Sequence, residues 1–394
     1  MISIPEGTSG VPSVAGPAPT AVYVHFPFCT HRCHYCDFSV ARSAEPPVAE
    51  WLDCVSAELD WWFDTAGWAS PVRLDTLFVG GGTPSLLGPE GMRELGRRLR
   101  GRLTLDERIE WTAEANPISF SEDLGSAWRE AGVNRLSLGV QSLDDGVLRW
   151  LGRLHDADAA ARAVEAARAA GFASVNLDLM FGLPAGVRRD LAAELGRVTD
   201  LGVEHVSAYG LTIEARTPLA QWVELGRVKP ASGAAYAAEY REVASRLAGD
   251  GYEHYEVSSF ARPGHQCRHN WYYWNRAPYL GLGPSAHGFL PPNRIWNVFR
   301  WVAYRDVVRA GAGPVEGSER LGAREVELER LWLGLRTDRG LPATDPAWGD
   351  RAKMAGWLQA GWLRREDDRV VASVEGWLRM DAMVSELWNG EASD

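Results

Sequence analysis

Lysine is nearly absent from this chain of 394 residues. Only Lys229 and Lys353 are lysines among its 41 basic residues, so chemistry that depends on a lysine amine has few places to occur. The formal net charge is −11, and an acidic surface is poorly suited to binding a phosphate backbone. We therefore expect no nucleic-acid partner.

Long apolar runs are missing as well. No segment approaches the roughly 18 consecutive apolar residues that a membrane span requires. Residues 1–31 contain neither Lys nor Arg, which removes the basic region of a secretory signal. We therefore expect a cytoplasmic protein. Residues 1–20 are rich in Gly, Pro, Ser and Ala and have little to bury, which predicts a flexible tail.

Cysteine is scarce and unevenly placed. Three of the five cysteines, Cys29, Cys33 and Cys36, lie within eight residues, while Cys54 and Cys267 stand apart. Such a set does not make a disulfide framework, and its clustering indicates metal or redox chemistry. Cys54 falls on an apolar helical face and is expected to be a small buried side chain.

A repeated pattern of strands and helices begins at Ala21. Runs rich in β-branched and aromatic residues predict buried parallel strands, with helical spacing between them. The six predicted strands span 21–26, 73–79, 109–115, 134–140, 174–181 and 205–211. The glycines that can end a helix just before a strand are Gly67, Gly132, Gly171, Gly202 and Gly251. Six βα units, rather than eight, predict an incomplete barrel of the α/β class.

A second module is predicted at the C-terminal end. Helices near 322–336 and 350–360, a hairpin over 362–372 and a helix over 375–388 resemble a winged-helix module. Residues 321–394 carry 10 basic and 14 acidic side chains, and this charge argues against DNA binding. The predicted regions are a tail at 1–20, a barrel at 21–255, a connecting region at 256–315 and this module at 316–394.

The clustered cysteines follow the first predicted strand, so they lie on a loop at its carboxyl end. In α/β barrels this end is where active sites are built. Three thiolates on one loop, from Cys29, Cys33 and Cys36, can hold three irons of a [4Fe–4S] cube. The fourth iron is then open to a ligand, which makes radical chemistry accessible.

Two other metal sites have to be weighed for this loop. A zinc site stays open as an alternative, because His25, His31 and His34 lie nearby in sequence. Heme attachment of the c type is excluded, because Asp37 rather than histidine follows Cys36.

The spacing C-x-x-x-C-x-x-C after a first barrel strand resembles the signature of radical S-adenosylmethionine (SAM) proteins. With the lead-in YVHFPFC, the chain from Ala21 onward resembles the oxygen-independent coproporphyrinogen III oxidase branch of that superfamily. The resemblance implies a partial (β/α)6 radical SAM barrel in which SAM chelates the open iron through its amino and carboxylate groups.

Further polar and glycine residues fall at the carboxyl ends of the predicted strands. Glycines after the second strand permit close backbone approach to a ligand, although a simple tight turn would look the same. Glu114 lies amid apolar neighbours and should meet a cation or hydrogen-bond donors. Gln141 ends the fourth strand, Arg153 is expected in a short helix, and Asp178 lies within the fifth strand beside Met180, a predicted core residue.

Each of these polar residues, taken singly, could equally be structural. The resemblance instead assigns the glycine turn to the amino-acid part of SAM and Glu114 to its ribose or ammonium region. The residues that it implies for the SAM pocket are Tyr23, Tyr35, Gly81, Gly82, Thr83, Glu114, Gln141, Arg153 and Asp178.

A second motif, C-R-H-N-W-Y-Y-W, begins at Cys267. Histidine is a common ligand of heme iron and aromatic rings line porphyrin pockets, but an aromatic core segment with a hydrogen-bonded histidine is the alternative. The pattern H-N-x-x-Y-W resembles a motif linked to heme binding in heme chaperones of the same branch. The resemblance therefore implies His269 as an axial heme ligand, and Cys267 stays open as a second candidate.

The residue at position 38 distinguishes the oxidases of this branch from its heme chaperones. The true oxidases have the pattern C-x-x-x-C-x-x-C-x-C, whereas Phe38 occupies the last position here. We therefore expect a heme chaperone that holds heme, a [4Fe–4S] cluster and SAM, and that delivers heme to acceptor proteins. Oxidative decarboxylation of coproporphyrinogen III is the alternative, and no residue is assigned a catalytic role. The resemblance also leaves open a homodimer and membrane contact through acceptor proteins.

Overall fold

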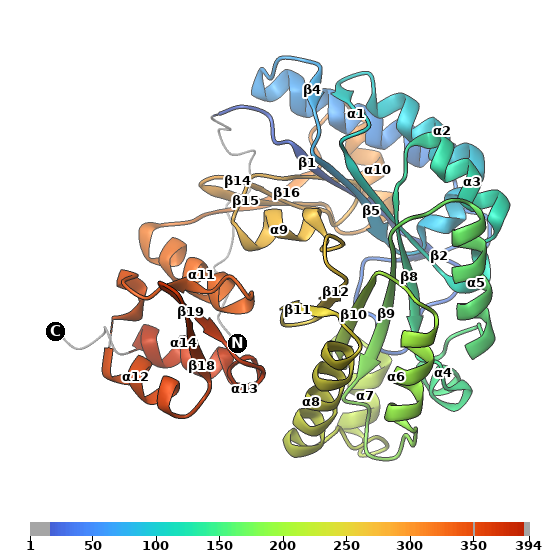
Figure 1. Ribbon diagram of the computed structural model, residues 1–394. Coiled ribbons are helices and arrows are strands. Elements are labelled where there is room, and N and C mark those ends of the chain that lie inside the picture. The colour runs from blue at the N-terminus through green and yellow to red at the C-terminus, as the bar shows by residue number, and fades with distance from the viewer. Residues whose placement is uncertain (1–15, 350, 390–394) are drawn as a thin grey trace.

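The computed structural model describes residues 16–349 and 351–389 (Figure 1). Most of the tail predicted at 1–20 lies outside these residues. Its last part, 16–20, lies against the barrel: Trp68 Nε1 donates to Gly16 O at 3.1 Å, and the Thr20 and Tyr272 hydroxyls are 2.9 Å apart.

A curved sheet forms the centre of the molecule, with strand order β11-β12-β10-β9-β8-β7-β5-β1-β13. Six neighbouring strands run parallel in chain order. They are β1 (Ala21–Phe26), β5 (Thr76–Gly81), β7 (Glu110–Ala115), β8 (Arg135–Gln141), β9 (Val175–Phe181) and β10 (His205–Gly210). The sheet ends at β11 and β13 instead of closing on itself. This confirms the predicted α/β class and the incomplete barrel.

Helices cover the outer, convex side of the sheet (Figure 1). They are α1 (Val48–Ala66), α2 (Gly88–Leu99), α3 (Glu122–Ala131), α5 (Ala157–Ala169), α6 (Leu191–Asp200) and α8 (Gly233–Gly249). The short helices α4 (Asp145–Leu151) and α7 (Pro218–Glu224) pack together in a separate apolar cluster. Gly67 and Gly132 end α1 and α3 with φ of 64° and 118°, the left-handed conformation predicted for them.

The core lies between the sheet and these helices. Leu136, Leu138 and Val140 in β8 are all 0% exposed, as expected for a parallel strand that is covered on both faces. Trp51 and Cys54 of α1 are both buried in the main core, which confirms the prediction for Cys54. In the described part of the chain, no helix is both long and apolar enough to cross a membrane.

The sheet differs from the predicted pattern at two places. The strand predicted at 73–79 is divided into β4 (Val72–Arg73) and β5, because the Asp75 amide donates to Thr20 O and turns the chain between them. The segment predicted as a connection at 256–315 supplies two strands of this sheet, β12 (Ser259–Ala261) and β13 (Leu280–Leu282), the last parallel to β1. The edge strand β11 (Glu253–Glu256), at the end of the predicted barrel, pairs with β12.

Smaller elements surround the barrel. Next to it lies a three-stranded antiparallel sheet of β14 (His287–Leu290), β15 (Asn293–Asn297) and β16 (Val315–Arg320). The short helices nearby are α9 (Arg268–Trp274) and α10 (Trp301–Arg309). Short strands β2 (Phe28–Cys29) and β3 (Ala41–Arg42) pair with each other, and β6 (Leu103–Thr104) pairs with β4.

The C-terminal module contains the two predicted helices and the predicted hairpin, with a further short strand between the helices. Its elements are α11 (Ala323–Arg336), β17 (Leu341–Pro342), α12 (Arg351–Gln359), β18 (Leu363–Glu366), β19 (Arg369–Ala372), α13 (Val374–Trp377) and α14 (Met380–Asn389). The single helix predicted at 375–388 is wrong. The chain tightens after Trp377, where the Arg379 amide bonds to Gly376 O three residues back, and two helices result.

Candidate functional site

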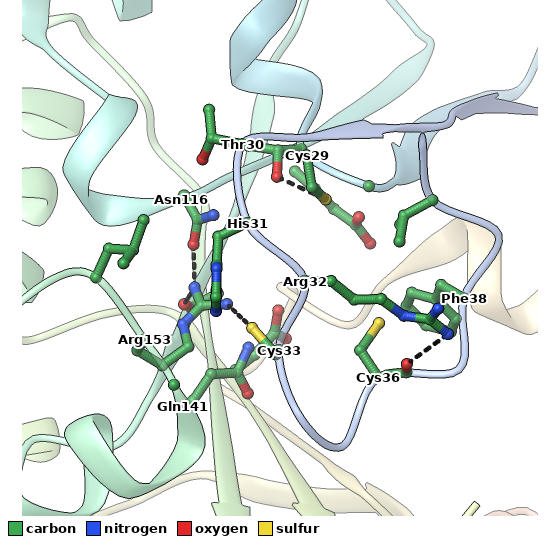
Figure 2. A pocket seen from close by; sticks show the side chains of 18 of the residues that line it. Cys29, Thr30, His31, Arg32, Cys33, Cys36, Phe38, Asn116, Gln141 and Arg153 are labelled. Carbon is green, nitrogen blue, oxygen red and sulfur yellow. Dashed lines mark hydrogen bonds between the residues drawn. The ribbon is translucent and has the colours of Figure 1, made fainter. Parts of the chain in front are cut away.

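The three clustered cysteines lie on a loop that is tied at its base. Strand β2 ends at Cys29 and pairs with β3, so the chain leaves the barrel after Cys29 and returns at Ala41. Cys29, Cys33 and Cys36 all line one cavity of about 340 Å³ at the carboxyl ends of the parallel strands (Figure 2). All three are free thiols in this structure.

Two of the thiols receive hydrogen bonds from groups that favour a thiolate. Thr83 Oγ1 lies 3.2 Å from Cys29 Sγ, and Arg153 Nη1 lies 3.6 Å from Cys33 Sγ. Burial nevertheless raises the pKa of Cys29 to about 11 and also raises the pKa of Cys36. A metal or cluster that binds these sulfurs therefore has to displace protons.

Arg153 connects the cysteine loop to the barrel. Its Nη2 donates to Gly139 O at 2.7 Å and to Asn116 Oδ1, and its side chain lines the cavity (Figure 2). Its Nε is buried without a hydrogen-bond partner among the described residues, so it remains a donor for an anionic group. Arg153 was predicted in a short helix. It actually follows the end of α4, after Gly152 with φ of 72°.

The donor set fits an iron–sulfur cluster. In a [4Fe–4S] cube each thiolate binds a different iron, whereas zinc needs its ligands to converge on one ion. Within residues 16–349 and 351–389, no three His, Cys, Asp or Glu side chains form such a single-ion site. Three separate thiols around one cavity, with the Arg153 cation beside them, match the requirements of a cluster.

Glycines beside the thiols let the backbone pack closely against neighbouring parts of the protein at the edge of the cavity. Gly81 has a φ of 112°, and a Cβ there would lie 2.6 Å from the His25 ring. A Cβ on Gly82 would lie 2.5 Å from the backbone oxygen of Phe28. Both positions therefore require glycine, and Thr83 follows them with its hydroxyl on Cys29.

Two carboxyl groups face the same cavity. The Gly81 amide donates to Glu114 Oε2 at 3.0 Å, so the partner predicted for Glu114 is a backbone donor. Burial, together with the nearby charge of Asp178, raises the pKa of Glu114 to about 8. Asp178 accepts from Asn176 Nδ2 at 2.8 Å, and burial raises its pKa as well. These carboxyls favour a cationic ligand, which would relieve the cost of ionising them.

Gln141 and Tyr35 complete the predicted lining. Gln141 ends β8 with a φ of 69°, which is uncommon outside glycine, and the pairing of β8 with β9 shifts between Leu138 and Gln141. Backbone strain of this kind is typical of ligand sites. Burial raises the pKa of Tyr35, which lines the cavity and stays a neutral phenol.

Tyr23 and the second motif lie elsewhere in the barrel. The Tyr23 hydroxyl bonds to His25 Nδ1 at 3.0 Å, and Tyr23 lies outside the lining of the cavity. His269 is 0% exposed, and its two ring nitrogens are each 2.8 Å from the hydroxyls of Thr76 and Tyr273. Thr76 begins β5, so His269 lies toward the amino ends of the strands, opposite the cavity.

The second candidate in that motif is buried too. Cys267 is 1% exposed, and its thiol donates to Glu110 Oε1 at 3.7 Å. Burial lowers the pKa of His269 to about 3, so its ring is neutral. Heme ligation by either residue stays a prediction, and it requires the segment around α9 to open.

The cavity also contains residues that the sequence pattern did not single out. Asn116 follows β7 and holds Arg153, and its place just after a predicted strand was the available signal. Met180, predicted to pack only in the core, is buried and also lines the cavity. It lies two residues from Asp178 on β9, so the two side chains share one face of the strand.

The fold and this cavity define a radical SAM protein. Residues 23–195 match the family model of the Radical SAM superfamily. The solved structure of coproporphyrinogen III oxidase (HemN) from Escherichia coli, a radical SAM enzyme, has a TM-score of 0.77 to this structure. The match covers 94% of this chain and 90% of that one at 21% identity, which shows a shared fold.

Curated relatives narrow the class further. The heme chaperone HemW of Mycobacterium tuberculosis is 38% identical over 372 residues, which cover 94% of this chain and 95% of the relative. HemW of Bacillus subtilis is 34% identical and covers 82% of this chain and 84% of its own length. The chain belongs to the HemW family of radical SAM proteins.

Proposed function

We propose that this protein is a heme chaperone, which binds heme and delivers it to acceptor proteins. The observation that carries the proposal is the likeness to relatives named heme chaperones over nearly the whole chain, at 38% identity. Phe38 supports it, because the oxidases of the same branch have a fourth cysteine at this position. The likeness to HemN concerns the fold alone.

We further propose that the cavity holds a [4Fe–4S] cluster and SAM. Cys29, Cys33 and Cys36 would bind the cluster, and the cluster supplies an electron to SAM when both are present. Thr83 and Arg153 stabilise the thiolates by hydrogen bonds.

The rest of the cavity suits SAM itself. Gly81 and Gly82 line the cavity beside Thr83, and their packing against His25 and Phe28 fixes the backbone there. The carboxyls of Glu114 and Asp178 are suited to the positive charges of SAM, and Gln141 adds a polar side chain. The inclusion of Tyr23, a homodimer, membrane contact through acceptors and a cytoplasmic location stay predictions.

The cluster is tested by anaerobic reconstitution. Wild-type protein should take up about four irons per chain, and Cys29→Ser, Cys33→Ser or Cys36→Ser should each abolish uptake. Cys54→Ser is the matched control, because Cys54 is buried in α1 away from the cavity, so iron uptake should persist. Stoichiometric zinc without iron in the wild-type protein would contradict the cluster.

The chaperone function is tested by transfer of heme. Reconstituted protein loaded with heme should restore activity to a heme-free acceptor enzyme, and free heme at the same concentration should do so less well. A parallel incubation of the reduced protein with SAM and coproporphyrinogen III distinguishes the alternative. Formation of protoporphyrinogen there would identify an oxidase and overturn the proposal.

A further inference from the structure

One carboxylate fastens the start of the second motif to the barrel. Glu110, the first residue of β7, accepts from the Arg268 amide at 3.0 Å and from the His269 amide at 2.9 Å. The Cys267 thiol donates to the same carboxylate at 3.7 Å. Cys267 precedes α9 without a capping bond from its own side chain, so Glu110 caps the helix from another element. Three consecutive residues of the motif therefore depend on one side chain of the barrel.

The same place in the sheet also holds the His269 ring. The ring is 0% exposed, and its two nitrogens lie 2.8 Å from the hydroxyls of Thr76 and Tyr273. Thr76 is the register partner of Glu110 in the pairing of β5 with β7, so ring and backbone of His269 are bound at adjacent positions. A heme iron needs one of the ring nitrogens to be free. His269 can therefore bind heme only after this end of α9 leaves the barrel.

The opposite side of α9 faces the C-terminal module. Trp271 is two residues after His269, which places it about 200° around the helix. The Arg339 guanidinium lies 3.6 Å from the centre of the Trp271 ring. This contact acts on Trp271, whereas Glu110 bonds to the His269 amide itself. Glu110 is therefore the charged group that acts directly on the predicted heme ligand.

We propose that Glu110 is a positioning residue for heme binding, which holds the second motif closed against the barrel until heme reaches His269. The inference rests on the proposed heme chaperone function and on His269 as the predicted ligand. A closed state lowers the apparent affinity for heme in proportion to the fraction of molecules that are open. Loss of the Glu110 carboxylate should therefore tighten heme binding, whereas damage to the fold would weaken it.

The first test is a hemin titration of the full-length reconstituted protein. Loss of a hydrogen bond to a charged group shifts an equilibrium by about ten- to hundredfold, so Glu110→Ala should lower the dissociation constant for hemin at least about tenfold. Glu110→Gln keeps one acceptor oxygen and should give a smaller gain. Glu107→Gln is the matched control, because Glu107 is exposed in the turn before β7. This control should bind hemin like the wild type.

The gain in affinity has to depend on His269. The double variant Glu110→Ala/His269→Ala should lose it, and the visible spectrum of hemin bound to Glu110→Ala should match that of the wild type. Iron and sulfide content before hemin is added should stay at the wild-type level. Glu110 begins β7, whereas the cysteine cavity lies at the carboxyl ends of the strands.

Hydrogen exchange without heme tests the closed state by itself. The two amides that bond to Glu110 lose their acceptor in Glu110→Ala, so their faster exchange would be uninformative. The Ala277 amide instead bonds to Tyr272 O at 2.9 Å, at the far end of α9. If the segment opens as one unit, Ala277 should exchange faster in Glu110→Ala than in the wild type.

The outcomes separate this inference from the proposed function. If the wild type and both Glu110 variants bind no heme, the proposed function fails and the inference fails with it. If the wild type binds heme and Glu110→Ala binds it equally tightly or more weakly, the function stands and the inference is overturned. A gain that persists in the double variant would also overturn it, because heme would then occupy another site. Unchanged exchange at Ala277 would show that Glu110 does not hold the segment closed.

Discussion

The carboxyl of Glu114 should make SAM binding depend on pH. Its pKa of about 8 means that roughly one molecule in ten carries the ionised form at pH 7. SAM is a sulfonium cation, so it should bind better to the ionised carboxylate than to the neutral acid. Binding should therefore draw a proton off Glu114.

The magnitude follows from that pKa. If only the ionised form binds, the dissociation constant for SAM rises about tenfold for each unit that the pH falls below about 8, and it levels off above that pH. Glu114→Gln is the matched variant, because the amide oxygen of Gln can still accept from the Gly81 amide. In this variant the part of the pH dependence that belongs to Glu114 should disappear.

The assay is anaerobic equilibrium dialysis of SAM against reconstituted protein between about pH 6 and pH 9. The amino group of SAM titrates in the same range, so the informative quantity is the difference in slope between the wild type and Glu114→Gln. Parallel slopes would refute the reasoning, since they would show that Glu114 does not change its charge when SAM binds.

Three further changes test other parts of the structure. Gly82→Ala should destabilise the protein by about 1–3 kcal/mol in thermal unfolding, because its Cβ meets the Phe28 carbonyl; an unchanged midpoint would contradict the close approach. Glu58 is fully buried, and burial raises its pKa to about 7. The protonated side chain therefore stabilises the fold fully below about pH 4.5, and this stabilisation is lost as the pH rises to about 7. Between pH 4.5 and pH 8, the free energy of unfolding measured with urea should fall by about 3 kcal/mol more in the wild type than in Glu58→Gln. An equal pH dependence of the two proteins would contradict this. Asn176→Leu should weaken SAM binding several-fold by removing the donor to Asp178, and unchanged binding would show that this hydrogen bond does not position the carboxyl.

The residues that line the cavity at the ends of the strands could be predicted from the sequence for a geometrical reason. The carboxyl ends of parallel strands meet at one edge of the sheet, so residues that end different strands come together. Gly81, Glu114, Gln141 and Asp178 illustrate this, since each comes from a different strand and all line one cavity. The spacing of the cysteines then marked which edge carries the chemistry.

Other features depend on packing that a sequence pattern does not encode. Met180 and Ile118 are apolar, and nothing in the sequence distinguishes an apolar residue of the core from one that faces a cavity. The motif around His269 has the composition of a heme site and also that of a core segment. Only the packing of α9 beside β5, where Thr76 bonds to the ring, shows that His269 is buried in this structure.

The second motif is nevertheless joined to the cavity by buried hydrogen bonds. The Cys267 amide donates to Tyr255 Oη at 3.1 Å, which lies 2.7 Å from His205 Nε2. His205 Nδ1 lies 2.6 Å from Asn176 Oδ1, and Asn176 donates to Asp178. Burial holds the pKa of His205 well below its usual value, so its ring is neutral, and the tautomer with the proton on Nδ1 satisfies both contacts. Every donor in this series then points toward the Asp178 carboxyl, so buried hydrogen bonds connect the second motif to a group that faces the cavity.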